Sequence, residues 1–227
     1  MGEKVKTMAR RKKYKFPKTT IERLSYYFRA LEDLSKRGID TVSSEALGGK
    51  LNIKSSQIRK DLSYFGDFGK RGMGYDVKYL LKELKYILGL DREWSVVIVG
   101  AGHIGAAMAN YDSFGKRGFN IAAIFDNDEK KIGKEINGTP VLPYDNLDDF
   151  VKQNKIEMAI IAVPAAAAQA VADKLVESGV TAILNFAPVA VQLDENVRCL
   201  SVDLTTKLEA LAYYMSYSQD KLWKIYS

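Results

Sequence analysis

The 227-residue sequence contains only one cysteine, Cys199, and one histidine, His103. These counts exclude a disulfide within one chain, a cysteine-rich metal site and any site that needs two histidines, so we expect no metal centre. No apolar run approaches the ~20 residues that cross a bilayer, and the first residues form no apolar signal-peptide core. These absences favour a cytoplasmic globular protein that does not bind a membrane.

What the sequence does contain is an uneven distribution of charge. Residues 1–90 carry 21 Lys+Arg against 10 Asp+Glu, whereas residues 91–227 carry 13 against 18. A basic first part predicts contact with a polyanion such as nucleic acid, the alternative being a gradient of solubility with a basic tail. Residues 1–16 hold seven of the cations and are expected to form a flexible basic arm.

Residues 17–89 predict a small helical module. Short apolar repeats at three- and four-residue spacing are preceded by capping residues and separated by turns. The expected helices are Ile21–Lys36, capped by Thr19 or Thr20 and ended by Gly38; Glu45–Leu51, capped by Ser43 or Ser44; one from Ser55 or Ser56 to about Tyr64; and Asp76–Leu88. The two short central helices, joined by a tight turn, are typical of a helix-turn-helix.

A glycine-rich segment follows the third helix. Residues 65–75 contain four glycines, interleaved with Lys70 and Arg71 and bracketed by aromatic residues. Glycine permits tight turns and close approach to a duplex, and the cations can meet its phosphates. The segment therefore favours a β-hairpin wing and a DNA-binding winged helix, the alternative being a helical module that binds another protein.

The third helix is expected to read the DNA. Ile58, Leu62 and Phe65 should face the core, which leaves polar donors outside that can reach phosphates and base edges in a major groove. The residues expected to contact DNA are Ser43, Ser44, Lys54, Ser55, Ser56, Gln57, Arg59, Lys60, Ser63, Tyr64, Lys70, Arg71, Gly72 and Tyr75.

Residues 94–203 predict a doubly wound parallel sheet that binds a dinucleotide. The β-branched run Trp94–Val99 is typical of a buried parallel strand, and it leads into a G-x-G-x-x-G motif and a helix to about Lys116. In this Rossmann fingerprint Gly100 allows the turn, Gly102 lets the backbone reach a pyrophosphate and Gly105 lets helix and strand pack. The helix N-terminus then holds the anion.

An acidic residue strengthens this prediction. The next expected strand, Asn120–Phe125, ends at Asp126, 21 residues after Gly105. A carboxylate there accepts hydrogen bonds from the adenosine ribose and repels a 2′-phosphate, so NAD(H) should be preferred over NADP(H). The alternative is an aspartate that only forms a turn.

The remaining segments alternate as a doubly wound sheet requires. Expected are a strand near Val141, a helix Asp145–Gln153, a strand Met158–Val163, a helix Ala165–Ser178, and strands Ala182–Asn185 and Arg198–Val202. Ligands in such sheets lie beyond the carboxyl ends of the strands, although tight helix packing explains the alanine run at 165–168 equally well. The expected cofactor-binding residues are therefore Gly100, Ala101, Gly102, His103, Ile104, Gly105, Asp126, Val163, Pro164, Ala165, Asn185, Phe186 and Ala187.

Residues 204–227 predict a last helix, from Leu204 to about Ile225, with an apolar stripe that needs a partner surface. We expect a second subunit to cover it, because a winged helix usually needs two-fold symmetry to read a palindromic site. The alternative is packing on its own domain.

This order of parts resembles the bacterial redox-sensing transcriptional repressors of the Rex family. The matching segments are residues 23–24, 27–31, 42–47, 58–66, 69–75, 110–111, 125–126, 131–133, 187–188 and 202–204. The resemblance implies a homodimer that binds palindromic operator DNA when NADH is scarce and leaves it when NADH binds, while NAD+ competes for the same pocket. It also implies that the C-terminal helix is exchanged between subunits.

The resemblance further implies a switch. Tyr111 would lie near the nicotinamide, and Asp203 would pair across the dimer with Arg29. His103 departs from the family, which usually has asparagine there; an imidazole could still reach the pyrophosphate, the alternative being a solvated loop residue.

Two other functions stay open. A DNA-binding regulator that senses a CoA ligand is one, because an alanine-rich segment after the fourth strand also occurs in CoA-binding Rossmann domains. An NAD-dependent dehydrogenase is disfavoured because hydride transfer needs an acid–base group, and the sole histidine lies in the phosphate loop. We therefore expect no enzyme.

Overall fold

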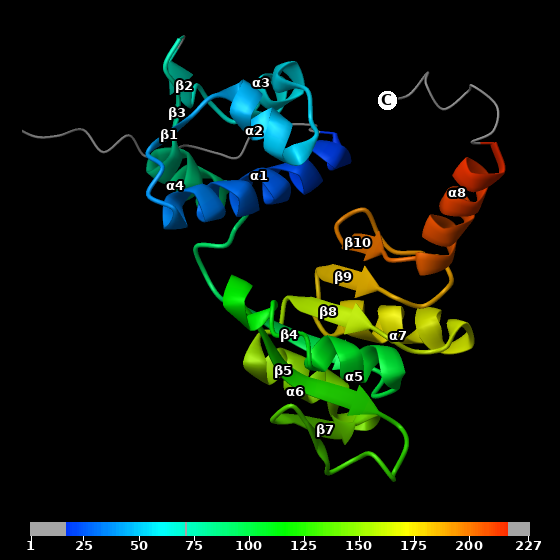
Figure 1. Cartoon of the computed structure of the whole chain (residues 1–227). Helices are drawn as coiled ribbons and strands as arrows, with labels where there is room; N and C mark the ends of the chain where they lie inside the picture. The colour runs from blue at the N-terminus through cyan, green and yellow to red at the C-terminus, as the bar shows by residue number, and fades with distance from the viewer. Residues whose placement is uncertain (1–16, 71, 218–227) are drawn as a thin grey trace, which may run out of the picture. The chain divides into compact units, whose positions relative to one another are not determined.

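The computed structural model of the protein describes residues 17–70 and 72–217, and the chain divides between Arg92 and Glu93 into two units (Figure 1). The expected basic arm 1–16, Arg71 of the expected wing and the end of the expected last helix lie outside the described residues. Within the described ranges, no helix has the length and apolar character needed to span a membrane.

The first unit is a helical module with a small sheet, as the sequence predicts. Its elements are α1 (Lys18–Lys36), β1 (Thr41–Val42), α2 (Ser44–Leu51), α3 (Ser55–Ser63), β2 (Gly69–Lys70), β3 (Gly74–Asp76) and α4 (Val77–Ile87). The strands pair antiparallel in the order β1-β3-β2, so β2 and β3 form the expected hairpin wing. A fully buried core that includes Leu24, Leu47, Ile58, Leu62 and Leu80 holds the helices together.

Some of the predicted helix caps are wrong. Pro17 precedes α1, and Thr20 is buried inside the helix. Lys54, not a serine, precedes α3. By contrast Ser43 caps α2 as predicted, since its Oγ accepts a hydrogen bond from the N–H of Ala46 at 3.0 Å. Proline and lysine can start these helices because packing of the apolar face contributes more to a helix than its cap does.

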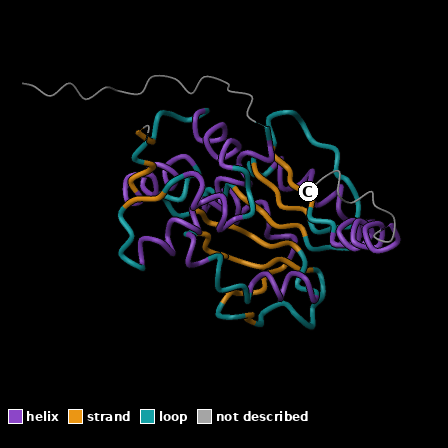
Figure 2. Tube along the Cα trace, turned by 45° about the horizontal axis from the view of Figure 1, so that its top comes forward, coloured by secondary structure: helices purple, strands orange, loops and turns teal. Residues whose placement is uncertain are grey.

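The second unit is a three-layer α/β fold. Its elements are β4 (Trp94–Val99), α5 (His103–Ala109), η1 (Gly115–Arg117), β5 (Phe119–Asp126), β6 (Glu135–Ile136), β7 (Thr139–Pro143), η2 (Tyr144–Asn146), α6 (Leu147–Asn154), β8 (Met158–Ile161), α7 (Ala165–Glu177), β9 (Ala182–Asn185), β10 (Arg198–Ser201) and α8 (Leu204–Tyr217). The strand order β10-β9-β8-β4-β5-β7, all parallel, is that of a dinucleotide-binding sheet, with its switch point between β4 and β8 (Figure 1). In Figure 2 the orange strands lie side by side, flanked by purple helices.

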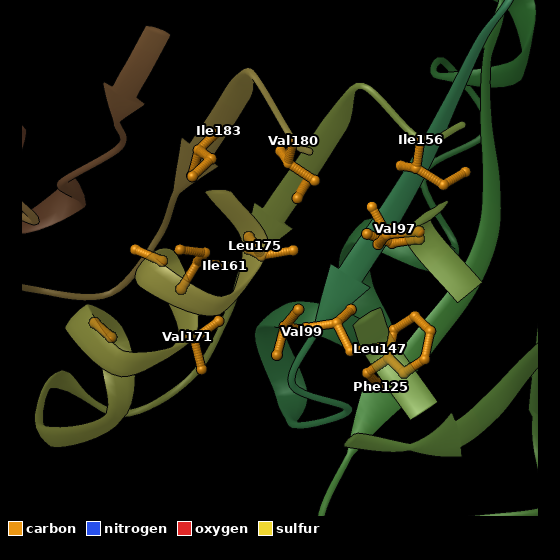
Figure 3. Close-up of a cluster of buried hydrophobic side chains, with 14 of the residues drawn as sticks. Val97, Val99, Phe125, Leu147, Ile156, Ile161, Val171, Leu175, Val180 and Ile183 are labelled. Atoms are coloured by element: carbon orange, nitrogen blue, oxygen red, sulfur yellow. The ribbon is translucent and has the colours of Figure 1, made fainter. Parts of the chain in front are cut away.

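Alternate side chains of each strand enter two different cores. Val97 and Val99 pack with α6 and α7, where Leu147, Val171 and Leu175 join them (Figure 3). Val96 and Ile98 face the opposite side and pack toward Ala109 of α5. This two-sided burial explains why the strand reads as a continuous apolar run.

The structure corrects two predictions at the edges of this unit. Helix α5 ends at Ala109 instead of near Lys116; the N–H of Tyr111 donates to the carbonyl of Met108, three residues back, and the chain then turns. The short strand β6 was not expected; it pairs antiparallel with β7. The turn between them is Asn137-Gly138, both at positive φ (52° and 75°), the preferred pair for a two-residue hairpin.

Candidate nucleotide and DNA sites

The glycine loop lies at the carboxyl end of β4, beside the switch point of the sheet. Gly100 has φ 105°, and a Cβ there would come within 2.4 Å of the carbonyl oxygen of Ala162, in the chain that leaves β8. A Cβ on Gly105 would lie 1.8 Å from the carbonyl oxygen of Gly100. Both positions therefore require glycine for the packing of the loop itself.

Gly102 differs from the other two glycines of the motif. An added Cβ would meet no described atom of the protein within 4 Å, and the backbone is extended, with φ −78° and ψ −171°. Gly102 is also the N-cap of α5, and no side chain caps the helix there. The amides that begin α5 are thus available to an anion on the open side of the loop.

Asp126 ends β5 next to this loop and is nearly buried, with 8% of its surface exposed. Its Oδ2 accepts a hydrogen bond from the N–H of Ala101 at 2.7 Å, and its Oδ1 accepts one from the N–H of Asp128 at 2.8 Å. The hydrogen bond from the Asp128 N–H forms a turn, which is the alternative role expected for Asp126 from the sequence. The carboxylate therefore shapes its own turn and also connects β5 to the glycine loop.

A lysine that sequence reasoning missed completes this group. Nζ of Lys131 lies 3.1 Å from Oδ2 of Asp126 and 3.7 Å from Oδ2 of Asp128. Burial by itself would raise the pKa of Asp126, but the hydrogen bonds from Asp128, Ala101 and Lys131 outweigh burial and lower that pKa below its ordinary value. The carboxylate is thus ionised and oriented before any ligand arrives.

The other expected cofactor residues lie at the same edge of the sheet but differ in exposure. Pro164 precedes α7 and Ala165 begins it, and both are exposed, as are His103, Ile104 and Tyr111. Val163 and Phe186 are half-buried. The Tyr111 ring packs edge-on against Phe114, with centroids 5.0 Å apart. Ala187 and Asn185 are both buried. The side-chain amide of Asn185 accepts a hydrogen bond from the N–H of Ala187 and donates one to the carbonyl of Val189. The Asn185 side chain therefore shapes the loop after β9.

In the first unit, a hollow of about 600 Å³ lies between α3, the start of α2 and the β2–β3 wing. Arg59 of α3 lines it, and its Nη1 donates to Oγ of Ser44 at 2.8 Å and to Oε1 of Glu45 at 3.0 Å. Of the other expected DNA contacts, Ser43, Ser63 and Gly72 line the hollow and are exposed. Elsewhere on α3 and at its start, Lys54, Ser56, Lys60 and Tyr64 are exposed, while Ser55 and Gln57 are half-buried.

Two expected DNA contacts are buried instead. Ser44 is 7% exposed because it begins α2 beneath Arg59, and Tyr75 is 8% exposed because it alternates into the core from β3. Each contributes to the wall of the hollow, but their side chains do not stand on the surface. Lys70 is part of β2.

A buried acid on α3 was also missed. Asp61 is fully buried and accepts hydrogen bonds from Thr20, Arg23 and Tyr27 of α1 and from Gln57 of α3. The sequence contains the signal, because residue 61 falls three residues after Ile58 on the inner face of the helix. This cluster joins α3 to α1.

The residues of the expected switch are divided between the units. Arg29 is an exposed residue of α1 in the first unit, and Asp203 is exposed in the second. Oδ1 of Asp203 accepts hydrogen bonds from the N–H groups of Thr205 and Thr206 at 2.8 and 3.3 Å, so Asp203 caps α8. Along α8, apolar side chains are exposed, among them Leu208 at 67%, Leu211 at 58% and Met215 at 74%.

Family models and sequences of known proteins match both units. One model, described as a CoA binding domain, matches residues 91–189, and another, described as a putative DNA-binding protein N-terminus, matches residues 15–63. The redox-sensing transcriptional repressor Rex of Carboxydothermus hydrogenoformans is 52% identical over 89% of this chain and 97% of that protein. Its namesake in Streptomyces coelicolor is 46% identical over 87% of this chain and 77% of that protein.

Solved structures match over nearly the whole chain. RSP, a Rex-family repressor, was crystallised in complex with β-NAD+ and operator DNA; that chain superposes with a TM-score of 0.86 at 38% identity, covering 94% of this chain and 98% of its own. RSP in complex with β-NADH superposes with a TM-score of 0.83 at 37% identity, covering 94% of this chain and 100% of its own.

Proposed function

Because the chain belongs to the Rex family of redox-sensing transcriptional repressors, we propose that it binds operator DNA through α3 and the wing and that NADH releases it. The observation that carries the proposal is the presence in one chain of a basic winged helix and a glycine loop with a preorganised carboxylate, Asp126. A dehydrogenase is not supported, since the relatives matched over most of the chain are named repressors.

Three groups of residues form the nucleotide site, and each contacts a different part of the nucleotide. The open side of Gly102 and the first amides of α5 receive the pyrophosphate of NADH or NAD+. Asp126 receives the adenosine ribose hydroxyls. Tyr111 and Phe186 supply an aromatic and apolar environment that favours the neutral, reduced nicotinamide over its cation.

Release of DNA requires a coupling free energy between the two sites. NADH shifts the protein from the DNA-binding state only if it binds the other state more tightly; equal affinity for both states shifts nothing. We propose that the coupling acts in a homodimer, in which the exposed apolar side chains of α8 dock on the partner subunit and Asp203 pairs with Arg29 across the interface. A change in the distance between the two recognition helices then means that they no longer match the spacing of the two half-sites of the operator.

The test is a binding titration of an operator fragment, selected from a randomised duplex pool, with NADH and NAD+ added separately. NADH should release the fragment at concentrations at which NAD+ does not, and Gly102→Val should keep DNA binding but lose the response. Binding that is unchanged at saturating NADH would overturn the proposal. Since operator DNA is chromosomal, the protein is proposed to act in the cytoplasm.

A CoA ligand is the second candidate, favoured by the family model that matches residues 91–189. The ionised Asp126 disfavours it, because the ribose of CoA carries a phosphate that this carboxylate would repel. Calorimetry with NADH, NAD+, NADPH and acetyl-CoA separates the two candidates, since each predicts a different tightest ligand.

A further inference from the structure

The buried cluster around Asp61 packs α3 against α1 and also orients the side chain of Gln57. Oδ2 of Asp61 accepts hydrogen bonds from Nε of Arg23 at 2.6 Å and from the Tyr27 hydroxyl at 2.7 Å. Oδ1 accepts from Nη2 of Arg23 at 2.8 Å and from Oγ1 of Thr20 at 3.1 Å. The remaining donor is Gln57, which stands one turn earlier on the same helix, with its Nε2 2.9 Å from Oδ1.

This last contact orients the side-chain amide of Gln57. Burial alone would raise the pKa of Asp61, but hydrogen bonds from Arg23, Tyr27 and Gln57 lower it, so the group is an ionised carboxylate. An ionised carboxylate accepts hydrogen bonds and donates none, so Gln57 can approach it only with its nitrogen. The amide oxygen, Oε1, therefore points away, and no described residue donates to it.

Gln57 lies in the first turns of the helix that is proposed to enter the major groove, and it is half-buried. An amide oxygen in that place can meet base edges that differ in kind. Adenine N6 and cytosine N4 are donors, whereas N7 of a purine, O6 of guanine and O4 of thymine are acceptors. An oxygen can pair only with the donors.

We propose that Asp61 orients Gln57 so that its amide oxygen accepts a hydrogen bond from an exocyclic amino group, of adenine or cytosine, in the operator. Gln57 is then a specificity-determining residue and Asp61 is its positioning residue. The proposal rests on the DNA-binding function given above and adds the chemistry of one base contact. Only one hydrogen of Nε2 is used on Asp61, so the other can still donate to N7 where the base is adenine.

The experiment first locates the base pair and then removes single groups from it. Binding of wild-type protein and Gln57→Ala is measured, without nucleotide, to operator fragments that carry each single base-pair change. At the pair where only the wild type discriminates, one fragment lacks the exocyclic amino group and another carries a 7-deazapurine, which lacks N7. Gln153→Ala, an exposed helical glutamine of the second unit, is the matched control.

Loss of the amino group should weaken wild-type binding about three- to tenfold and leave Gln57→Ala unaffected. The 7-deaza fragment should weaken wild-type binding by no more than loss of the amino group does, and Gln153→Ala should behave as the wild type throughout. A Gln57-dependent cost of losing N7 that exceeds the cost of losing the amino group would overturn the proposal, as would the absence of any base pair that depends on Gln57.

The failure of this inference is separable from failure of the proposed function. If NADH releases wild-type protein from the operator but no base pair depends on Gln57, only the inference fails. If NADH has no effect while the amino-group dependence is present, the redox response fails and the base contact stands.

Discussion

The two units of the protein each bury one aspartate with a lowered pKa, and the two are held in different ways. Asp61 is bound by side chains alone, and three of these come from α1, 34 to 41 residues away in the sequence. Asp126 is bound by two backbone N–H groups and one lysine, Lys131. A carboxylate surrounded by side chains holds helices together, whereas one supported by the backbone at a loop can remain available to a ligand.

The largest effect is expected from Asp61→Ala. Removing this carboxylate leaves the partly buried guanidinium of Arg23 and the hydroxyls of Thr20 and Tyr27 without their acceptor, which should lower the free energy of unfolding of the first unit by about 3–5 kcal/mol. Urea denaturation followed by far-UV circular dichroism measures the loss. NADH affinity of the second unit should stay unchanged.

The matched control for this variant is Asp33→Ala. Asp33 also lies in the first unit and pairs with Arg37 and Lys50, but these ion pairs lie at the surface and should contribute far less. An equal loss of stability in the two variants would show that the buried cluster is no more important than a surface ion pair.

The next effect in size concerns the loop beside Asp126. Gly102→Val should weaken NADH binding by about a hundredfold or more, because the branched side chain enters the open side of the loop while the fold accepts it. Gly105→Ala is the contrasting variant, since its Cβ would collide with the carbonyl of Gly100 and should lower the melting temperature. A Gly102→Val protein that melts as early as Gly105→Ala would contradict this division of roles.

Asp126→Ala should have a smaller and more selective effect. NADH binding should weaken about tenfold, because hydrogen bonds between the ribose and a charged carboxylate are lost, and discrimination against NADPH should relax. Calorimetric titration of both nucleotides measures the ratio of their affinities. If that ratio is unchanged, the carboxylate only stabilises the glycine loop and does not contact the ribose.

How far the sequence predicts each aspartate follows from what surrounds it. The position of Asp126, at the end of β5 and beside the glycine loop, was predicted correctly because the strand, the glycine motif and the spacing are all local in sequence. Its contact with the ribose stays a prediction. The contact of Lys131 with Asp126 was missed because the turn that brings the lysine next to the carboxylate leaves no periodic pattern of apolar residues in the sequence. Asp61 was missed because its position on the inner face was judged from apolar residues alone, and its partners on α1 are brought near only by tertiary packing.

Local and tertiary contributions also account for the other agreements and differences between the predicted and the observed structure. The doubly wound sheet and the wing were predicted because their signals, the apolar strands and the glycine-rich run, each lie within a short segment. Ser44 and Tyr75 were expected on the surface because of their polar groups, but packing of β3 and α2 buries them. The switch between Arg29 and Asp203 stays a prediction, since it depends on a second subunit.

Acid should weaken both carboxylate clusters. A carboxyl whose pKa is lower in the folded state contributes stability above its ordinary value of 3.8, and that contribution is lost as the pH falls below it. Melting temperatures of the wild type should therefore decrease as the pH falls from about 5 toward about 3, and Asp126→Asn should show a shallower decrease. Parallel curves for the two proteins would mean that Asp126 has an ordinary pKa in the folded state.

The smallest effect is expected from Lys131→Met, and it tests whether Asp126 is truly available to a ligand. The ammonium group of Lys131 lies 3.1 Å from the carboxylate, and its side chain is 38% exposed, so the ion pair is only partly shielded from water. Removing it should increase the preference for NADH over NADPH by less than about fivefold, because the carboxylate then repels a 2′-phosphate without a nearby cation. Lys130→Met, which removes an exposed neighbouring lysine, controls for the change in net charge. A decrease in the preference would mean that Lys131 itself holds the ribose of NADH, and the carboxylate would then be a bracing group like Asp61.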